Sequence, residues 1–285
     1  MGKIIDGRSL AQKLNSRLGR EVKKFPKAWP KPTLAVVLVG NHEASEVYVR
    51  QKAKACSAVG IKSVVRLLPS STSEKKLLRL IDRLNRSKHI NGILVQLPLP
   101  KQIDPKKVIG HISPDKDVDG FHPNNMGRLF GSNDPNPLLP CTPLGIMALL
   151  NSTRVKISGK HAVVVGRSHI VGRPIAELLL QADATVTICH SRTKNLKKHI
   201  HHGDIVVAAV GKPHMVKGRW LKKGAIAIDV GISRLGNKRL VGDIDFKTAK
   251  KRCSFITPVP GGVGPMTIAM LLANTIKAYK IQKGI

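Results

Sequence analysis

Aromatic residues and cysteines are scarce in this 285-residue chain. Aromatic residues make up 3% of it, so there is little with which to stack nucleic-acid bases. Four widely spaced cysteines form no C-x-x-C pair: Cys56, Cys141, Cys189 and Cys253. This spacing argues against a zinc site and against a disulfide framework, and it fits a reducing compartment. We therefore expect no metal site and a cytoplasmic location.

Long apolar segments are missing as well. The first residues, MGKIIDGRSL, contain no apolar core of a signal peptide, and Asp6 occupies the position where a myristoylation motif needs Ser or Thr. The stretch 261–276 is interrupted by Thr267, Asn274 and several glycines, so it is not expected to span a bilayer. These absences predict a protein that makes no contact with a membrane.

Acidic residues are too few to balance the basic ones. Lys and Arg number 49 against 17 Asp and Glu, which gives a formal net charge of +32 and a pI near 10.6. Such a charge is typical of nucleic-acid-binding proteins. The basic residues are scattered through every segment, however, and we interpret them as a solvated surface with weak, non-specific attraction for polyanions. No specific nucleic-acid partner is expected.

The remaining composition, with 42% hydrophobic residues, is sufficient for two cores. In the first half, apolar strand patterns at 33–39, 63–68 and 92–97 alternate with helical patterns at 8–24, 43–59, 73–87 and 104–112. Strands that alternate with helices indicate a parallel, doubly wound α/β layer. Residues 113–140, rich in Pro, Asn, Gly and Asp, are predicted to form a long loop.

A second α/β region follows. The pattern predicts helices at 142–150 and 175–180, and strands at 162–165, 184–188, 204–210 and 225–230. A last helix, about 267–281, has no partner in this region and is expected to return to the first. The predicted fold class is α/β with two domains and a cleft between them. One domain is 1–140, completed by the helix 266–285, and the other is a Rossmann-like domain, 141–265.

The turn at Gly166 is the first candidate binding site. An apolar strand ends on Gly166, and Arg167, Ser168 and Gly172 lead into a helix with Pro174 in its first turn. A strand, a glycine turn and a helix start together aim backbone N–H groups at a phosphate. The pattern is G-x-S-x-x-V-G rather than G-x-G-x-x-G, so on its own it is equally compatible with a structural turn.

The end of the next strand indicates which dinucleotide binds. An NAD site has an acidic residue about 20 residues after the turn for the ribose hydroxyls. Here the strand ends in His190-Ser191-Arg192, with no carboxylate. A serine and the guanidinium groups of Arg192 and Arg167 suit a 2′-phosphate. The predicted cofactor is NADP, and the alternative is that both arginines are solvated surface charges.

A second group of candidate residues comes from the first half. Tyr48 and Lys52 are four residues apart on one helix and share a face, Gln96 ends a strand, and Asp117 and Asp119 lie in a later loop. Beyond the carboxyl ends of parallel strands, such a set can bind a flat, hydrogen-bonding heterocycle. The alternatives are a packing pair for Tyr48 and Lys52, and turn capping for the aspartates.

The run TPVPGGVGP at 257–265 combines glycines, which let a ligand approach the backbone, with prolines that stiffen a loop. We expect it to form a wall between the two domains. When this run is taken together with the motifs above, the chain resembles the bacterial bifunctional methylenetetrahydrofolate dehydrogenase/methenyltetrahydrofolate cyclohydrolase family over effectively its full length. The matching stretches are YVRQK at 48–52, GILVQLPLP at 92–100, DKDVDGFH at 115–122, GRSHIVGRP at 166–174 and PVPGGVGPMT at 258–267.

The resemblance implies two consecutive reactions and a homodimer. Hydride passes from 5,10-methylene-tetrahydrofolate to NADP, and the methenyl product is hydrolysed to 10-formyl-tetrahydrofolate. By resemblance, Lys52 is the central catalytic group, Gln96 its partner, Tyr48 a stacking platform and Asp119 the carboxylate that holds the pterin. The other implied contacts are Val95, Leu97, Pro260, Gly261, Gly262 and Gly264 for the substrate, and Gly166, Arg167, Ser168, Ser191 and Ile232 for NADP.

Three alternatives stay open from the sequence. A nucleic-acid-binding protein would use the charge but has no use for the run at 257–265. A different NADP oxidoreductase, acting on a small hydroxy acid, is disfavoured by the set of Tyr48, Lys52, Gln96 and Asp119. A monofunctional dehydrogenase is disfavoured because Lys52 and Gln96 are both present.

Overall fold

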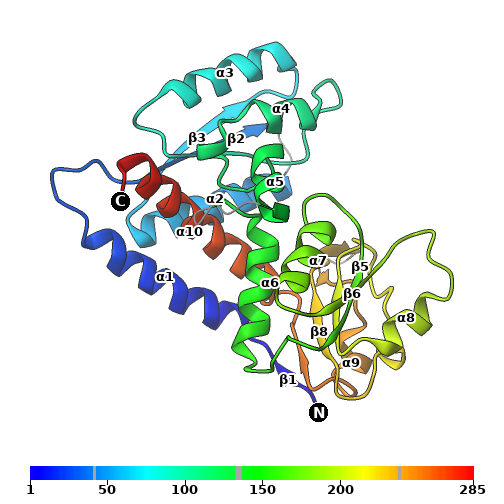
Figure 1. Cartoon of the computed structure of the whole chain (residues 1–285). Coiled ribbons are helices and arrows are strands. Elements are labelled where there is room, and N and C mark those ends of the chain that lie inside the picture. Colours follow the sequence, from blue (N-terminus) through cyan, green and yellow to red (C-terminus); the bar gives the residue numbers. More distant parts are fainter. Residues whose placement is uncertain (41–42, 132–136, 237–238) are drawn as a thin grey trace. The chain divides into compact units, whose positions relative to one another are not determined.

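The chain folds into two compact units, each built around a parallel sheet. The computed structural model describes residues 1–40, 43–131, 137–236 and 239–285, with residues 43–48 described by their backbone only (Figure 1). The three-stranded unit holds residues 12–141 and 268–285. The six-stranded unit holds residues 1–11 and 142–267.

The three-stranded unit has the strand order β3-β2-β4, with both pairs parallel. Its strands are β2 (Thr33–Val39), β3 (Lys62–Leu68) and β4 (Gly92–Val95). Its helices are α2 (Glu43–Val59), α3 (Glu74–Arg86), α4 (Pro105–His111), the short 3-10 helix η1 (Pro114–Lys116), α5 (Pro123–Gly131), most of α1 (Gly7–Lys23) and most of α10 (Val263–Lys283).

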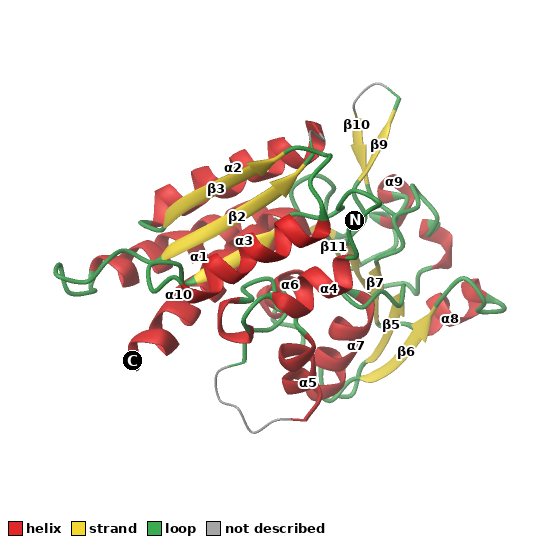
Figure 2. Cartoon of the chain, turned by 90° about the horizontal axis from the view of Figure 1, so that it is seen from above, coloured by secondary structure: helices red, strands yellow, loops and turns green. Residues whose placement is uncertain are grey.

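The central strand β2, TLAVVLV, is buried along its whole length because helices cover both faces of the sheet. Side chains alternate between the two faces of a strand. Positions 34, 36 and 38 pack in one apolar cluster with residues of α1, α2 and α10, and positions 35, 37 and 39 pack in another with residues of α3 and α4. Figure 2 shows β2 and β3 between α2 and α3. The predicted doubly wound layer is confirmed.

The six-stranded unit has the order β1-β11-β8-β7-β5-β6, and all its pairs are parallel. Its strands are β1 (Lys3–Ile4), β5 (His161–Val165), β6 (Thr185–Cys189), β7 (Ile205–Ala208), β8 (Ile226–Asp229) and β11 (Phe255–Ile256). The strands β9 (Ser233–Leu235) and β10 (Arg239–Val241) form an antiparallel pair. Its helices are α6 (Cys141–Ser152), α7 (Gly172–Gln181), α8 (Leu196–His202), η2 (Gly218–Trp220) and α9 (Phe246–Ala249).

The structure differs from the expectations at several points. The predicted loop 113–140 contains η1 and α5; the His122 ring accepts the Asn124 N–H at 3.0 Å as α5 begins, and glycines at 127 and 131 weaken its helical pattern. Residues 1–11, assigned to the first domain, belong to the six-stranded unit, because β1 pairs with β11. The β9–β10 pair was not expected, because strands of three residues are too short to show an alternating pattern.

Candidate active site

Lys52 and Gln96 form a hydrogen-bonded pair in the three-stranded unit. Lys52 lies on α2, and Gln96 follows the last residue of β4. Lys52 Nζ donates to Gln96 Oε1 at 2.9 Å, and Gln96 Nε2 donates to the Leu97 carbonyl oxygen at 2.7 Å. The second bond fixes which end of the amide faces the ammonium. Both side chains are only partly buried, so a ligand can reach them.

The carboxylate of Asp117 organises the loop that carries Asp119. Asp117 is 1% exposed, and it accepts hydrogen bonds from the N–H of Gly120 at 3.2 Å, the N–H of His122 at 2.7 Å and Asn125 Nδ2 at 2.9 Å. Its oxygens are committed to the loop. Of the two aspartates singled out in the sequence, Asp117 is therefore the one that caps a turn.

The carboxylate of Asp119 has no internal hydrogen-bond partner within the part of the chain that the structure describes. Burial raises the pKa of Asp119 to about 6, the Lys52 ammonium lowers it, and the charge of Asp117 raises it. Lys52 therefore lies close enough to act on Asp119 electrostatically. A carboxylate with free oxygens beside an ammonium can accept hydrogen bonds from a ligand.

Asn274 on α10 holds the same loop in place. Its Nδ2 donates to the carbonyl oxygens of Val118 at 2.9 Å and Leu139 at 2.8 Å, and the Cys141 thiol donates to the Val118 oxygen at 3.1 Å. Burial raises the pKa of the Cys141 thiol well above its usual value, so it is not a nucleophile. Sequence reasoning missed Asn274, although a polar residue inside an apolar helix is a signal of a buried hydrogen-bond role.

The other residues of this unit that were predicted to contact the substrate are Tyr48, Val95 and Leu97. Tyr48 lies on α2 one turn before Lys52, and its side chain is outside the described residues. Val95 is 6% exposed and packs in the apolar cluster below β4, so it cannot offer its side chain to a ligand. Leu97, which follows Gln96, is partly exposed.

The glycine turn in the six-stranded unit needs both of its glycines. Gly166 has a φ of +128°, and a Cβ there would lie 2.2 Å from the Ala209 oxygen. A Cβ at Gly172 would lie 2.3 Å from the Gly166 oxygen. Ser168 Oγ accepts the N–H groups of Val171 and Gly172 at 3.2 Å, so this side chain caps the start of α7. The turn is compact and leaves Arg167 and Ser168 exposed.

The predicted phosphate-binding arginines leave from adjacent strands. Val165 pairs with Cys189, so Arg167 follows β5 and Arg192 follows β6 at the same edge of the sheet. Arg192 and Ser191 are exposed, and the Arg192 N–H donates to His190 Nδ1 at 3.2 Å. Within the described ranges no carboxylate pairs with either arginine. The donor set fits a phosphate group.

The run at 257–265 is tightly packed where its glycines stand. Gly261 has a φ of +111°, and a Cβ at Gly262 would lie 2.6 Å from the Pro258 oxygen. Pro260 is exposed, whereas Gly261 and Gly262 are buried. A Cβ at Gly264 would lie 3.7 Å from Ile232 Cδ1. The structure thus brings Gly264 and Ile232, both predicted contact residues, together.

Residues 1–40, 43–131, 137–236 and 239–285 contain no group of three or more His, Cys, Asp or Glu residues that could hold a metal ion. No helix in these ranges combines the length and the apolar character that crossing a membrane requires.

Comparison with protein families gives two matches that together cover most of the chain. Residues 5–119 match the model for the tetrahydrofolate dehydrogenase/cyclohydrolase catalytic domain, and residues 140–283 match the model for the NAD(P)-binding domain of the same family. The bifunctional protein FolD of Geotalea daltonii is 55% identical over 281 residues, which cover 98% of this chain and 99% of that protein.

Solved structures show the same likeness. The bifunctional enzyme FolD, a methylenetetrahydrofolate dehydrogenase/cyclohydrolase from Campylobacter jejuni, superposes with a TM-score of 0.95 at 45% identity and covers 99% of each chain. The Trypanosoma brucei enzyme, solved with NADP cofactor and an inhibitor, has a TM-score of 0.95 at 40% identity and covers 100% of this chain and 99% of that chain.

Proposed function

The chain belongs to the tetrahydrofolate dehydrogenase/cyclohydrolase family, and we propose that it oxidises 5,10-methylene-tetrahydrofolate with NADP and hydrolyses the methenyl product to 10-formyl-tetrahydrofolate. The observation that carries this proposal is the Lys52–Gln96 hydrogen bond beside the Asp119 carboxylate, which accepts no hydrogen bond from the residues that the structure describes. The two reactions place the protein in one-carbon metabolism.

The first reaction depends on positioning. NADP, when bound, accepts the hydride, and orientation rather than a protein acid is the main requirement of that step. Asp119 holds the pterin by accepting its N–H groups, and Tyr48 is the stacking platform. The 2′-phosphate is bound by Ser191, Arg192 and Arg167. The turn beside it is formed by Gly166 and Ser168.

The second reaction needs protons to move. Water forms a bond to the methenyl carbon and loses a proton, and a ring carbon–nitrogen bond then breaks while that nitrogen takes up a proton. Lys52 supplies an amino group that can donate a proton in this site. The hydrogen bond to Gln96 Oε1 fixes the position of Lys52 Nζ. We assign the proton transfers to Lys52, with Gln96 as its partner.

Separate assays of the two reactions test the proposal. Purified protein is given methylene-tetrahydrofolate with NADP or with NAD, and in a second cuvette methenyl-tetrahydrofolate without any nucleotide. The expected results are faster reduction of NADP than of NAD, and hydrolysis in the second cuvette. Oxidation without accelerated hydrolysis would favour a monofunctional dehydrogenase.

Acid is expected to weaken capture of the folate. Asp119, with a pKa of about 6, must be ionised to accept the pterin N–H groups. The ionised fraction of Asp119 should be constant above pH 7 and fall about tenfold per pH unit well below pH 6, and kcat/KM for the folate substrate should follow it. In Asp119→Asn, kcat/KM should be lower throughout and should lack this acid limb. The same acid limb in Asp119→Asn would show that another group titrates.

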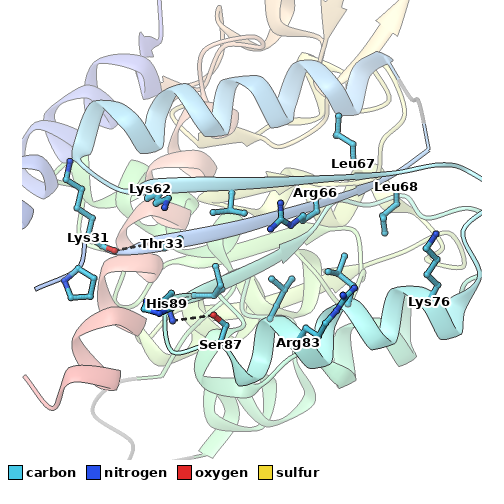
Figure 3. Close-up of a pocket in the computed structure, with 15 residues that line it drawn as sticks. Lys31, Thr33, Lys62, Arg66, Leu67, Leu68, Lys76, Arg83, Ser87 and His89 are labelled. Carbon is cyan, nitrogen blue, oxygen red and sulfur yellow. Dashed lines mark hydrogen bonds between the residues drawn. The ribbon is translucent and has the colours of Figure 1, made fainter.

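We also propose that the protein is a cytoplasmic homodimer, with β3 at the interface. β3 is an edge strand of its sheet, and Leu67 on it is 69% exposed. Beside β3 lies a groove of about 790 Å³, whose lining combines basic side chains, among them Lys62, Arg66 and Arg83 (Figure 3), with the apolar residues Val64, Leu68, Leu80, Leu84 and Ile90. A second copy that pairs its own β3 antiparallel to this one would satisfy the open edge.

The substitution Leu67→Lys is expected to dissociate this dimer. Each interface would contain two copies of Leu67, and burying each is worth about 1.5–3 kcal/mol, so the dissociation constant should rise at least about 100-fold. Light scattering over a dilution series measures it. Leu180→Lys, at a 57% exposed leucine of α7, is the matched control and should leave the mass unchanged. An unchanged mass for Leu67→Lys would exclude this interface.

A further inference from the structure

Two buried aspartates lie at the carboxyl edge of the six-stranded sheet. Asp229 is the last residue of β8, and Asp243 follows β10. They are 3% and 0% exposed. The chemistry proposed above uses neither of them.

Their carboxylates collect backbone N–H groups from three loops. Asp229 Oδ1 accepts from Gly231 at 3.1 Å and from Asp243 at 2.8 Å, and Asp229 Oδ2 accepts from Ile244 at 2.9 Å. Asp243 Oδ2 accepts from residues 210 and 211 at 2.6 and 3.0 Å. These bonds tie the loops that follow β7, β8 and β10 to one another.

Glycines make room for both carboxylates. A Cβ at Gly242 would lie 2.0 Å from Asp229 Oδ2, and a Cβ at Gly231 would lie 2.3 Å from Asp243 Oδ1. Neither glycine has a φ in the left-handed region, so space rather than backbone conformation requires them. Each carboxylate thus packs against a glycine, Asp229 against Gly242 and Asp243 against Gly231.

The cluster is costly for the folded state. Neither aspartate forms an ion pair with the residues that the structure describes, and Asp243 Oδ1 is buried without a hydrogen-bond partner there. Burial raises the pKa of Asp229 to about 7, and the charge of Asp243 adds to this. Such costs are expected where a function requires a fixed loop shape.

We propose that Asp229 and Asp243 are positioning residues that set the affinity for NADP by fixing the loops after β7 and β8. In a doubly wound sheet the dinucleotide lies beyond the carboxyl ends of the strands. Ile232, a proposed NADP contact, follows Gly231 directly. Loops already held in the bound shape lose less conformational entropy on binding. The inference rests on the proposed NADP site.

Calorimetric titration of the whole protein with NADP tests this. Asp243→Ala removes the oxygen that accepts the N–H groups of residues 210 and 211. The Kd of this variant for NADP should rise by about tenfold or more. Asp243→Asn keeps one oxygen and should recover part of the affinity. Hydrolysis of methenyl-tetrahydrofolate without nucleotide should change by less than about twofold in both variants, since the residues assigned to its proton transfers, Lys52 and Gln96, lie in the other unit.

Asp204→Asn is the matched control. The Asp204 carboxylate accepts the His161 N–H at 3.0 Å and Lys222 Nζ at 2.6 Å. It lies at the amino ends of β5 and β7, away from the carboxyl ends where the dinucleotide is expected, so its loss should leave the Kd for NADP unchanged. A wild-type Kd in either folded Asp243 variant would overturn the inference. If Asp243→Ala does not fold, Asp243→Asn decides by the same criterion. A wild-type protein that binds no NADP would refute the proposed cofactor, and the inference with it.

Discussion

Replacing Lys52 with methionine is expected to abolish hydrolysis of methenyl-tetrahydrofolate while oxidation of methylene-tetrahydrofolate survives. General acid–base catalysis contributes about 10²–10⁴-fold, and the loss of hydrolytic kcat should fall in this range. Oxidation should slow by less than about tenfold, because hydride transfer depends on orientation and the substrate keeps its other contacts. Methionine has a similar length and cannot donate to Gln96 Oε1, which Lys52 Nζ contacts at 2.9 Å.

The matched control is Lys54→Met, at an exposed lysine on the same helix. It removes one charge of the same sign and should leave both activities unchanged. Equal losses of both reactions in Lys52→Met, with an equal rise of both KM values, would mean that Lys52 serves binding rather than proton transfer.

The substitution Arg192→Ala is expected to raise KM for NADP by about 10–100-fold, because hydrogen bonds to a charged group contribute about 1.5–3 kcal/mol. KM for NAD, which lacks the 2′-phosphate, should hardly change. Initial rates with each nucleotide at saturating methylene-tetrahydrofolate measure the effect. The preference for NADP over NAD should therefore shrink.

Lys194→Ala controls for the general positive field. Lys194 is an exposed cation two residues beyond Arg192, and its removal should alter KM for the two nucleotides little and equally. If Arg192→Ala weakened NADP and NAD by the same factor, Arg192 would be a surface charge rather than a phosphate contact.

Local patterns were sufficient to predict the elements that carry the site. The helix at 43–59 is confirmed by α2, and the helical pattern at 73–87 is confirmed by α3, which Ser73 caps with its Oγ accepting the Lys76 N–H at 3.3 Å. The pairing of Gln96 with Lys52, known only through resemblance, appears as a direct hydrogen bond. Elements and helix caps depend on neighbours in the sequence, so the sequence alone could indicate them.

Contacts between distant residues could not be predicted in this way. Asn274 bonds to an oxygen of Val118, 156 residues earlier, and the carboxylate of Asp243 reaches back to residues 210 and 211. The residue pattern alone did not distinguish the aspartates at 117 and 119, and the choice of Asp119 came from the resemblance. Only the folded loop shows that Asp117 is committed to backbone N–H groups, whereas Asp119 has no hydrogen-bond partner among the described residues.

The most direct test of the account follows a single reaction mixture of protein, methylene-tetrahydrofolate and NADP, with reduced nucleotide, methenyl and formyl products measured together. NADPH is expected to form in step with the sum of methenyl and 10-formyl products, and the formyl product should accumulate faster than free methenyl-tetrahydrofolate hydrolyses in buffer. NADPH accompanied only by methenyl product would contradict the assignment of Lys52. No reduction with either nucleotide would contradict the proposed function altogether.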